Sequence, residues 1–174
     1  LEHLARVVGD KGVTFCPVVF NGARKCENFL QQELFALDFD DGIAYSEVKD
    51  MAERYCLPIS FSYYTFSSTE DKPKFRVVLR HIVPVTDNLS AEVVLAMLKE
   101  LFPMADKQCF DLARMFFGGK RLIEYNPQAC FNLSELAYAF QQELNWQDTV
   151  NYKRNIERFA CKNGIGILDK GILD

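Results

Sequence analysis

The chain has 174 residues, enough for one domain with a small appendage. Its composition, 49% apolar and 25% charged, is that of a globular protein and excludes disorder and low complexity. A net charge of −4 argues against indiscriminate nucleic-acid binding but is compatible with local basic patches. No apolar run approaches the roughly 18 residues of a membrane span, and no signal peptide is recognisable. We therefore expect no membrane partner and a cytoplasmic location. The first residue is not Met, which is compatible with a piece of a longer protein.

The cysteines indicate free thiols rather than a disulfide or zinc framework. None are spaced as C-x-x-C, and no histidine lies close to any pair of them. Cysteines spread through apolar segments are typical of buried thiols in a reducing cytoplasm. The six positions are Cys16, Cys26, Cys56, Cys109, Cys130 and Cys161.

The first third of the chain predicts a helix, two strands and a second helix. Apolar residues at helical spacing favour a helix over 1–9. A strand that contains a proline, and so lies at an edge or a bulge, is expected over 13–20. Residues 33–40 are apolar on both faces, as in a central strand covered on both sides. A helix over 44–56 follows.

The middle of the chain predicts a hairpin followed by a helix. Aromatic alternation over 59–66 and the apolar pattern of 75–85 indicate two paired strands, joined by the polar loop 67–73. An amphipathic stripe predicts a helix over 89–102, with Asn88 as its cap.

Short strands and helices follow toward the C-terminus. Strands are expected over 114–117 and 121–125, on either side of Gly118-Gly119. Helices are expected over 133–144 and 149–162. The sequence thus predicts an α+β domain with a mixed or antiparallel sheet and a helical C-terminal piece.

Two features mark these last helices. Asn132 and Glu135 form a capping-box pattern ahead of the first one. The second carries a basic stripe, which fits a solvated face or, alternatively, contact with a nucleic-acid backbone. The stripe consists of Arg154, Arg158 and Lys162.

Two carboxylates at the end of the central strand are the most informative feature. In LFALDFDDG, Asp38 and Asp40 are two residues apart and therefore project from the same face of the strand, while Phe39 points into the core. Adjacent carboxylates repel each other and raise each other's pKa. A divalent cation, Mg²⁺ or Mn²⁺, removes this penalty and uses both as oxygen ligands. Two-metal chemistry on a nucleotide phosphate uses such a pair together with a third carboxylate.

The best third carboxylate is Asp106. It follows a helix that Pro103 ends, where the chain should return to the sheet. Asp111 and Glu124 are rivals, the first as a cap or turn residue and the second on a predicted strand.

The D-x-D pattern has other uses. It can be a solvated strand end before a turn, or it can belong to a phosphatase with Asp38 as the nucleophile. The phosphatase pattern usually has Thr or Val where this chain has Gly42, and no matching downstream Lys and acidic pair is recognisable. We therefore rank the phosphatase last.

The hairpin loop could hold phosphate groups. Ser67 and Ser68 supply hydroxyls, and Lys74 and Arg76 supply cations on the following strand. An ordinary polar loop explains the same residues equally well. His81 lies within an apolar strand, where a packed side chain is the more usual role.

Basic residues also surround the glycine pair. Arg114, Lys120 and Arg121 could contact a triphosphate or a nucleic-acid backbone, or could simply solvate a hairpin.

Taken together, these residues resemble the archaeo-eukaryotic primase (AEP) superfamily, above all the primase–polymerase domains of phages, plasmids and mobile islands. The resemblance covers roughly residues 13–125. It starts with Arg24 and Asn28 before LDFDDG and continues through YTFSST and KFRVVL with a later Pro84. It ends with LFPMAD-x-x-C-x-D-x-AR-x-FFGG.

The resemblance implies a catalytic core with an RRM-like sheet and two-metal nucleotidyl transfer. Asp38 and Asp40 match the first family motif, and Ala105-Asp106 best matches the third. The second motif, S-x-H, is only partly present, because the loop reads Ser67-Ser68-Thr69. Arg76 or His81 would then supply the missing cation or donor.

The function expected from the resemblance is a DNA primase or primase–polymerase. Its partners would be a single-stranded DNA template, nucleoside triphosphates, and a fused or separate replicative helicase. The alternative is a catalytically weak DNA-binding replication module that retains the fold, as the missing His would suggest. The AEP-like core is expected over 1–130, with residues 131–174 as a helical extension packed on it.

Overall fold

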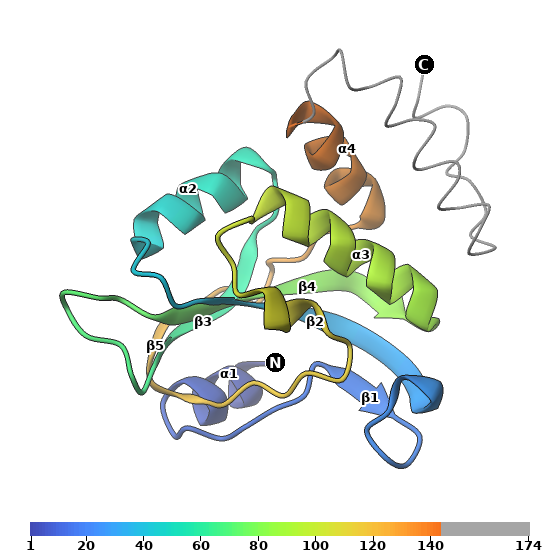
Figure 1. The fold of residues 1–174 in the computed structure, drawn as a ribbon, viewed down its shortest axis with the longest axis horizontal. Coiled ribbons are helices and arrows are strands. Elements are labelled where there is room, and N and C mark those ends of the chain that lie inside the picture. The colour runs from blue at the N-terminus through green and yellow to red at the C-terminus, as the bar shows by residue number, and fades with distance from the viewer. Residues whose placement is uncertain (144–174) are drawn as a thin grey trace.

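The computed structural model describes residues 1–143, which build one five-stranded sheet with helices on both faces (Figure 1). The expected helix over 149–162 and its basic stripe lie outside the described residues. The helices are α1 (Glu2–Gly9), α2 (Tyr45–Arg54), α3 (Asn88–Leu101) and α4 (Leu133–Glu143), with short 3₁₀ turns η1 (Cys26–Asn28) and η2 (Lys107–Phe110). The strands are β1 (Val18–Phe20), β2 (Phe29–Phe39), β3 (Ile59–Thr65), β4 (Phe75–Val85) and β5 (Gly119–Tyr125).

The sheet order is β1-β2-β4-β3-β5, and every strand pair is antiparallel. The expected α+β class and hairpin of β3 with β4 are confirmed. The two longest strands, β2 and β4, are neighbours inside the sheet. β1 pairs only with the beginning of β2, so the tip of β2 pairs with β4 on one side, and on the other side the Asp38 carbonyl accepts a hydrogen bond from the Asp106 amide. The second half of β2 is buried on both faces, as its apolar run predicts.

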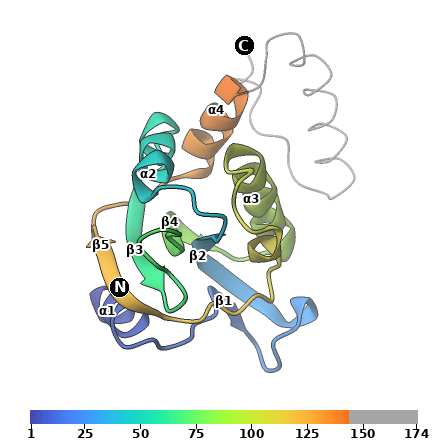
Figure 2. The same cartoon turned by 60° about the vertical axis from the view of Figure 1, so that its left-hand side comes forward.

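The two faces of the sheet are covered differently. Helices α2, α3 and α4 lie over one face, and α1 lies against the other beside β5 and β3 (Figures 1 and 2). On the first face, the Phe39 ring stacks on Phe75 with centroids 5.2 Å apart. On the second, Phe15 packs against Phe61 and Phe116. These aromatic contacts fix the sheet around the tip of β2.

Several element boundaries differ from expectation. The expected strand over 13–20 shrinks to β1, since Pro17 has no N–H for the ladder, and Phe15 makes an isolated antiparallel bridge with Phe116 instead. The segment 114–117 is therefore no strand of its own.

The cap of α3 is also shifted by one residue. Asp87, not Asn88, is the N-cap, and its carboxylate accepts a 2.8 Å hydrogen bond from the Ser90 amide. Both residue types cap helices well, so the sequence pattern alone did not separate them.

The helix α4 begins with the expected capping box. The Asn132 side chain accepts from the Glu135 amide at 2.9 Å, and the Glu135 carboxylate accepts from the Asn132 amide at 2.8 Å. The helix packs against α3. None of the helices within residues 1–143 is long and apolar enough to span a bilayer.

Candidate active site

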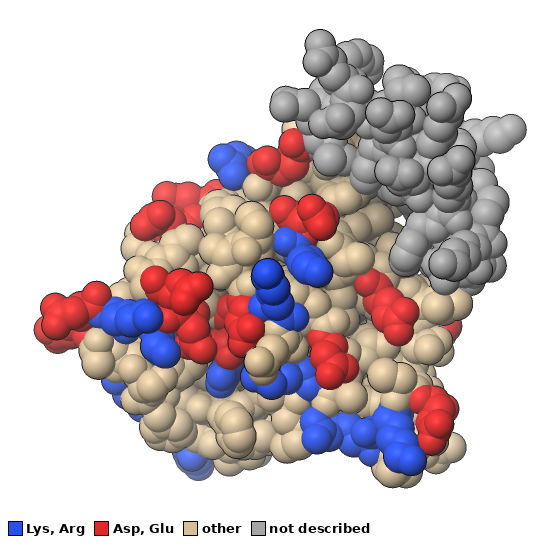
Figure 3. Space-filling model, viewed as in Figure 1, with Lys and Arg blue, Asp and Glu red and all other residues tan. Residues whose placement is uncertain are grey.

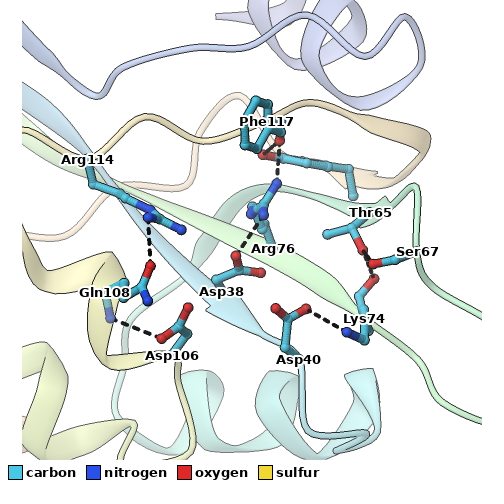
Figure 4. Close-up of polar contacts among 11 residues, drawn as sticks. Asp38, Asp40, Thr65, Ser67, Lys74, Arg76, Asp106, Gln108, Arg114 and Phe117 are labelled. Atoms are coloured by element: carbon cyan, nitrogen blue, oxygen red, sulfur yellow. Dashed lines mark hydrogen bonds and ion pairs between the residues drawn. The ribbon is translucent and has the colours of Figure 1, made fainter.

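The end of β2 places two carboxylates on one face of the sheet. Phe39 is fully buried in the core, so its neighbours Asp38 and Asp40 project to the opposite side (Figure 4). Asp38 is buried and Asp40 is half-buried. Gly42 has φ +84°, a left-handed conformation that suits glycine, where the chain turns from β2 toward α2.

Asp106 joins them from the loop after α3. Its amide donates a 2.8 Å hydrogen bond to the carbonyl of Asp38, which ties this loop to the tip of β2. Its carboxylate caps η2 by accepting from the Gln108 amide at 3.0 Å. One carboxylate oxygen from each of Asp38, Asp40 and Asp106 lies within 4.8 Å of the others. The expected convergence of these three residues, named here the acidic cluster, is confirmed.

The two rival carboxylates have other contacts. Asp111 accepts from the Ala113 amide at 2.9 Å, as a turn residue does. Glu124 forms a 2.6 Å ion pair with Lys49. Neither belongs to the acidic cluster.

Arg76 is the main partner of Asp38. The two residues face each other across β4 and β2, and Arg76 Nη2 lies 2.7 Å from Asp38 Oδ2. The other terminal nitrogen, Nη1, donates to the carbonyl of Phe117, and the guanidinium lies over the Phe116 ring. Both members of the pair are buried. The sequence suggested Arg76 as a triphosphate contact, but in the structure its guanidinium is engaged within the protein.

Tyr63 and the Phe117 carbonyl complete this row of polar groups, and the sequence patterns did not reveal either. Tyr63 lies opposite Arg76 on β3, and its hydroxyl donates to the same Phe117 carbonyl at 3.1 Å. Burial raises the pKa of Tyr63 to about 12, so its hydroxyl stays protonated at neutral pH and remains a donor. A tyrosine in a strand is ordinary by sequence, and only the register brings it to Arg76.

The electrostatics of the acidic cluster favour a cation. Burial raises the pKa of Asp38, Arg76 opposes this, and the charges of Asp40 and Asp106 raise it further. Burial tends to lower the pKa of Arg76, but Asp38 and Tyr63 raise it above its usual value. The net result is that the carboxylate of Asp38 is poorly compensated by Arg76 alone.

The donor set fits a hard divalent ion. Asp38 Oδ1 is buried and has no hydrogen-bond partner among the described residues. Such an orphaned oxygen is costly unless something binds it. An all-oxygen set of carboxylates is the kind that Mg²⁺ and Mn²⁺ use. The acidic cluster could therefore hold a divalent cation.

The hairpin loop contributes only part of what its sequence suggested. The Ser68 hydroxyl is buried and accepts from the Lys74 amide at 2.9 Å, while the Ser67 hydroxyl lies 3.3 Å from Thr65 Oγ1. The Lys74 ammonium lies 3.8 Å from Asp40 Oδ1. Of these residues, Lys74 brings a cation directly to the acidic cluster (Figure 4).

His81 does not lie beside the acidic cluster, contrary to the expectation that it could replace the missing motif histidine. Asp38 pairs with Arg76, so His81 is five residues further along β4, about 17 Å at the usual rise of a strand. Its Nδ1 lies 2.7 Å from the Val83 carbonyl, and its ring packs edge-on against Phe131. It is a packed strand residue.

The three basic residues near the glycine pair have separate surroundings. Arg114 donates to the Gln108 side chain at 2.8 Å, next to Asp106. Lys120 donates to the Ser68 carbonyl. Arg121 stacks over the Tyr64 ring at 4.9 Å. Lys120 and Arg121 line one pocket together with the hairpin loop, and its other lining residues include Tyr64, Ser68 and Thr69.

The surface near the acidic cluster is mixed in charge. On the face that Figure 3 shows, Lys and Arg lie among Asp and Glu, and a row of basic side chains runs along its lower part. A hollow next to the cluster is lined on one side by Asp40 and Asp41 and on the other by residues 103–108. A polyanion that approaches this face would therefore meet basic and acidic side chains together.

Comparison with known proteins supports the fold. No protein-family model matches the sequence, and no curated protein matches it. A solved structure does match: the AEP domain of the cyanophage S-2L primase-polymerase (PrimPol) is similar with a TM-score of 0.55 and 14% sequence identity. The match covers 71% of this chain and 68% of that one. The described part of this chain thus has an AEP-like fold, with three converging carboxylates at the end of a central strand.

Proposed function

We propose that this protein is a template-dependent nucleotidyltransferase, a DNA primase or primase–polymerase that acts in DNA replication. The observation that carries the proposal is the acidic cluster, whose carboxylate oxygens lie within 4.8 Å of one another in an AEP-like fold. The proposed substrates are nucleoside triphosphates and a single-stranded DNA template. A fused or separate replicative helicase remains a proposed partner.

The proposed reaction joins two nucleotides. The 3′-hydroxyl oxygen of a primer or an initiating nucleotide forms a bond to the α-phosphorus of the incoming nucleotide. The bond between the α- and β-phosphates breaks, pyrophosphate leaves, and the hydroxyl proton passes to solvent. Mg²⁺ or Mn²⁺ held by Asp38, Asp40 and Asp106 would supply charge neutralisation and a lowered pKa of the hydroxyl.

The chain's own residues would organise this site in three ways. Arg76 fixes the orientation of Asp38, so that Oδ1 remains available as a ligand. The Gln108 amide fixes Asp106 in the same manner. Lys74, beside Asp40, is the cation best placed for a triphosphate.

The other proposed contacts to the triphosphate and the template follow from where the polar and basic residues lie around the acidic cluster. Ser67 and Ser68 in the hairpin loop would lie toward the triphosphate, with backbone amides of this loop as further donors. Arg114, Lys120 and Arg121 would contact the template or phosphates. His81 takes no part in the proposed site, because it lies five residues beyond Arg76 along β4.

A catalytically weak DNA-binding replication module is the second candidate. Its support is the hairpin loop, where Thr69 stands in place of the histidine of the family's second motif. Lys74 is the one cation within 4 Å of the acidic cluster, apart from buried Arg76, among residues 1–143.

Strand synthesis separates the two candidates. The purified protein is incubated with labelled nucleotides and a single-stranded template, with and without a primer, in Mg²⁺, Mn²⁺ or EDTA. Metal-dependent products support the nucleotidyltransferase. Template binding without any product in either metal supports the non-catalytic module.

A further inference from the structure

Two phenylalanine rings near the acidic cluster are exposed although the backbone that carries them is fixed. The side chains of Phe117 and Phe66 are 67% and 64% exposed, the highest values among the large hydrophobic residues within residues 1–143. Burying such a ring is worth roughly 1.5–3 kcal/mol, so two exposed rings on adjacent segments indicate a surface that binds something.

The two rings come from neighbouring points of the sheet. Thr65 on β3 lies opposite Gly119 on β5, so Phe66 and Phe117 are each within two residues of this pair. The Phe66 ring lies over Gly12, since a Cβ at Gly12 would be only 2.5 Å from its Cζ. Gly12 in turn lies against Gly118, which follows Phe117 in the chain.

The backbone of Phe117 is held from several sides. Its carbonyl accepts hydrogen bonds from both Arg76 and Tyr63. A Cβ on Gly118 would lie 2.3 Å from the backbone of Gly12, and one on Gly119 would lie 2.1 Å from the Tyr64 carbonyl. Phe117 is therefore presented from a rigid support rather than from a loose loop, which lowers the entropy cost of using it as a contact.

The same support connects Phe117 to the acidic cluster. One guanidinium group, that of Arg76, binds the Phe117 carbonyl with one nitrogen and the Asp38 carboxylate with the other (Figure 4). Cations lie close by in the sequence and structure: Lys11 precedes Gly12, and Lys120 follows Gly119 and donates to Ser68. In proteins that bind single-stranded nucleic acid, bases stack on exposed aromatic rings and nearby cations contact the phosphates. The two rings and the two lysines offer both kinds of group.

We propose that Phe117 and Phe66 form a stacking platform for the bases of single-stranded DNA, with Lys11 and Lys120 near its phosphates. The proposal rests on the proposed function, because it places the template beside the acidic cluster. It adds the two residues that would contact the DNA bases, and these residues are aromatic rather than positively charged. Stacking on a ring is tolerant of base identity, so the platform would bind different sequences with similar affinity.

The test is binding of a single-stranded oligonucleotide in EDTA, where no synthesis takes place. A fluorescent base such as 2-aminopurine reports stacking through quenching, and anisotropy of an end label gives the Kd. The variants are Phe117→Ala, Phe66→Ala, Phe117→Leu, which keeps an apolar side chain without a ring, and Phe117→Trp, which keeps a ring. Tyr138→Ala is the matched control, since Tyr138 is an exposed aromatic (59%) on α4.

The expected result is a Kd about 5-fold or more higher for Phe117→Ala and Phe117→Leu, with loss of quenching. Phe66→Ala should weaken binding in the same direction, whereas Phe117→Trp and Tyr138→Ala should bind as the parent does. Because both rings are exposed, thermal unfolding should stay close to that of the parent, and this measurement checks folding.

Three results would overturn the proposal: no binding of the oligonucleotide by the parent protein, unchanged affinity in both Ala variants, or equal binding by Phe117→Leu and the parent. Ring-dependent binding by a protein that never synthesises a strand would support the platform and contradict nucleotidyl transfer. Strand synthesis together with unchanged binding in the Ala variants would support nucleotidyl transfer and contradict the platform. The two proposals can therefore fail separately.

Discussion

Arg76 and Asp38 form a buried ion pair across β4 and β2, with 2.7 Å between Nη2 and Oδ2. The pair joins the acidic cluster to the segment that carries Phe117, because the other end of the guanidinium binds the Phe117 carbonyl. Removing either charge leaves the other buried without its partner. The pair therefore orients the Asp38 carboxylate, and loss of either charge should destabilise the folded protein.

The first prediction concerns this pair. Arg76→Ala should lower the free energy of unfolding by about 3–5 kcal/mol, since it leaves the Asp38 carboxylate buried and unpaired. Urea unfolding measures the change. The surface variant Lys72→Ala should cost little, as its side chain is exposed. A loss below about 1 kcal/mol in Arg76→Ala would show that the pair contributes little to the fold.

The second prediction concerns metal binding. Mn²⁺ at about 100 times its Kd should stabilise the parent protein by about 2.7 kcal/mol and raise its Tm. In EDTA, Asp40→Asn should melt at a higher temperature than the parent, because it removes repulsion within the acidic cluster. The same variant should respond less to Mn²⁺. Thermal scans of both proteins in EDTA and Mn²⁺ supply all four values, and an undiminished Mn²⁺ response in the variant would contradict a role for Asp40 as a ligand.

The third prediction concerns pH. Burial and the neighbouring carboxylates raise the native pKa of Asp38 above its ordinary value of 3.8. The native state then holds the Asp38 proton more tightly than the unfolded state, so this group's contribution to stability falls as pH rises from about 3.8 through the native pKa. In EDTA, the free energy of unfolding of the parent relative to Asp38→Asn should decrease over this range. Denaturant titrations of both proteins at several pH values measure it, and an increase would show that Arg76 dominates instead.

The fourth prediction concerns Gly118. A Cβ at this position would lie 2.3 Å from the backbone of Gly12, so one of the two segments must move. Gly118→Ala should destabilise the protein by about 1–3 kcal/mol, the usual cost of overpacking. It should also weaken oligonucleotide binding, because Phe117 precedes it. Unfolding and anisotropy measurements on the variant test the two effects, and wild-type values for both would show that the contact yields easily.

Local patterns in the sequence predicted the core of the site. Strand alternation placed Asp38 and Asp40 on one face, and the helix end at Pro103 returned Asp106 to the sheet. Patterns of this kind depend only on neighbouring residues, which is why they carried over to the structure.

Features that depend on register between distant residues could not be predicted in the same way. Arg76 faces Asp38 only because β2 and β4 pair in one particular register, and periodicity does not specify it. The same register leaves His81 five residues along β4 from Arg76, away from the acidic cluster. The proline in the first strand predicted an edge or a bulge, and β1 is correspondingly short. The bridge between Phe15 and Phe116 joins segments about a hundred residues apart, and no local pattern indicates it.

Primer extension on a single-stranded template, in Mg²⁺ or Mn²⁺, tests the central claim most directly. The comparison uses the parent, Asp40→Asn and Asp106→Asn, with Asp41→Asn as the control. Asp41 is an exposed neighbour of Asp40 and lies outside the acidic cluster. We predict that the parent extends the primer, that Asp40→Asn and Asp106→Asn lose the activity by orders of magnitude, and that Asp41→Asn retains it. Extension at the parental rate by both cluster variants, or no extension by the parent in either metal, would contradict the account.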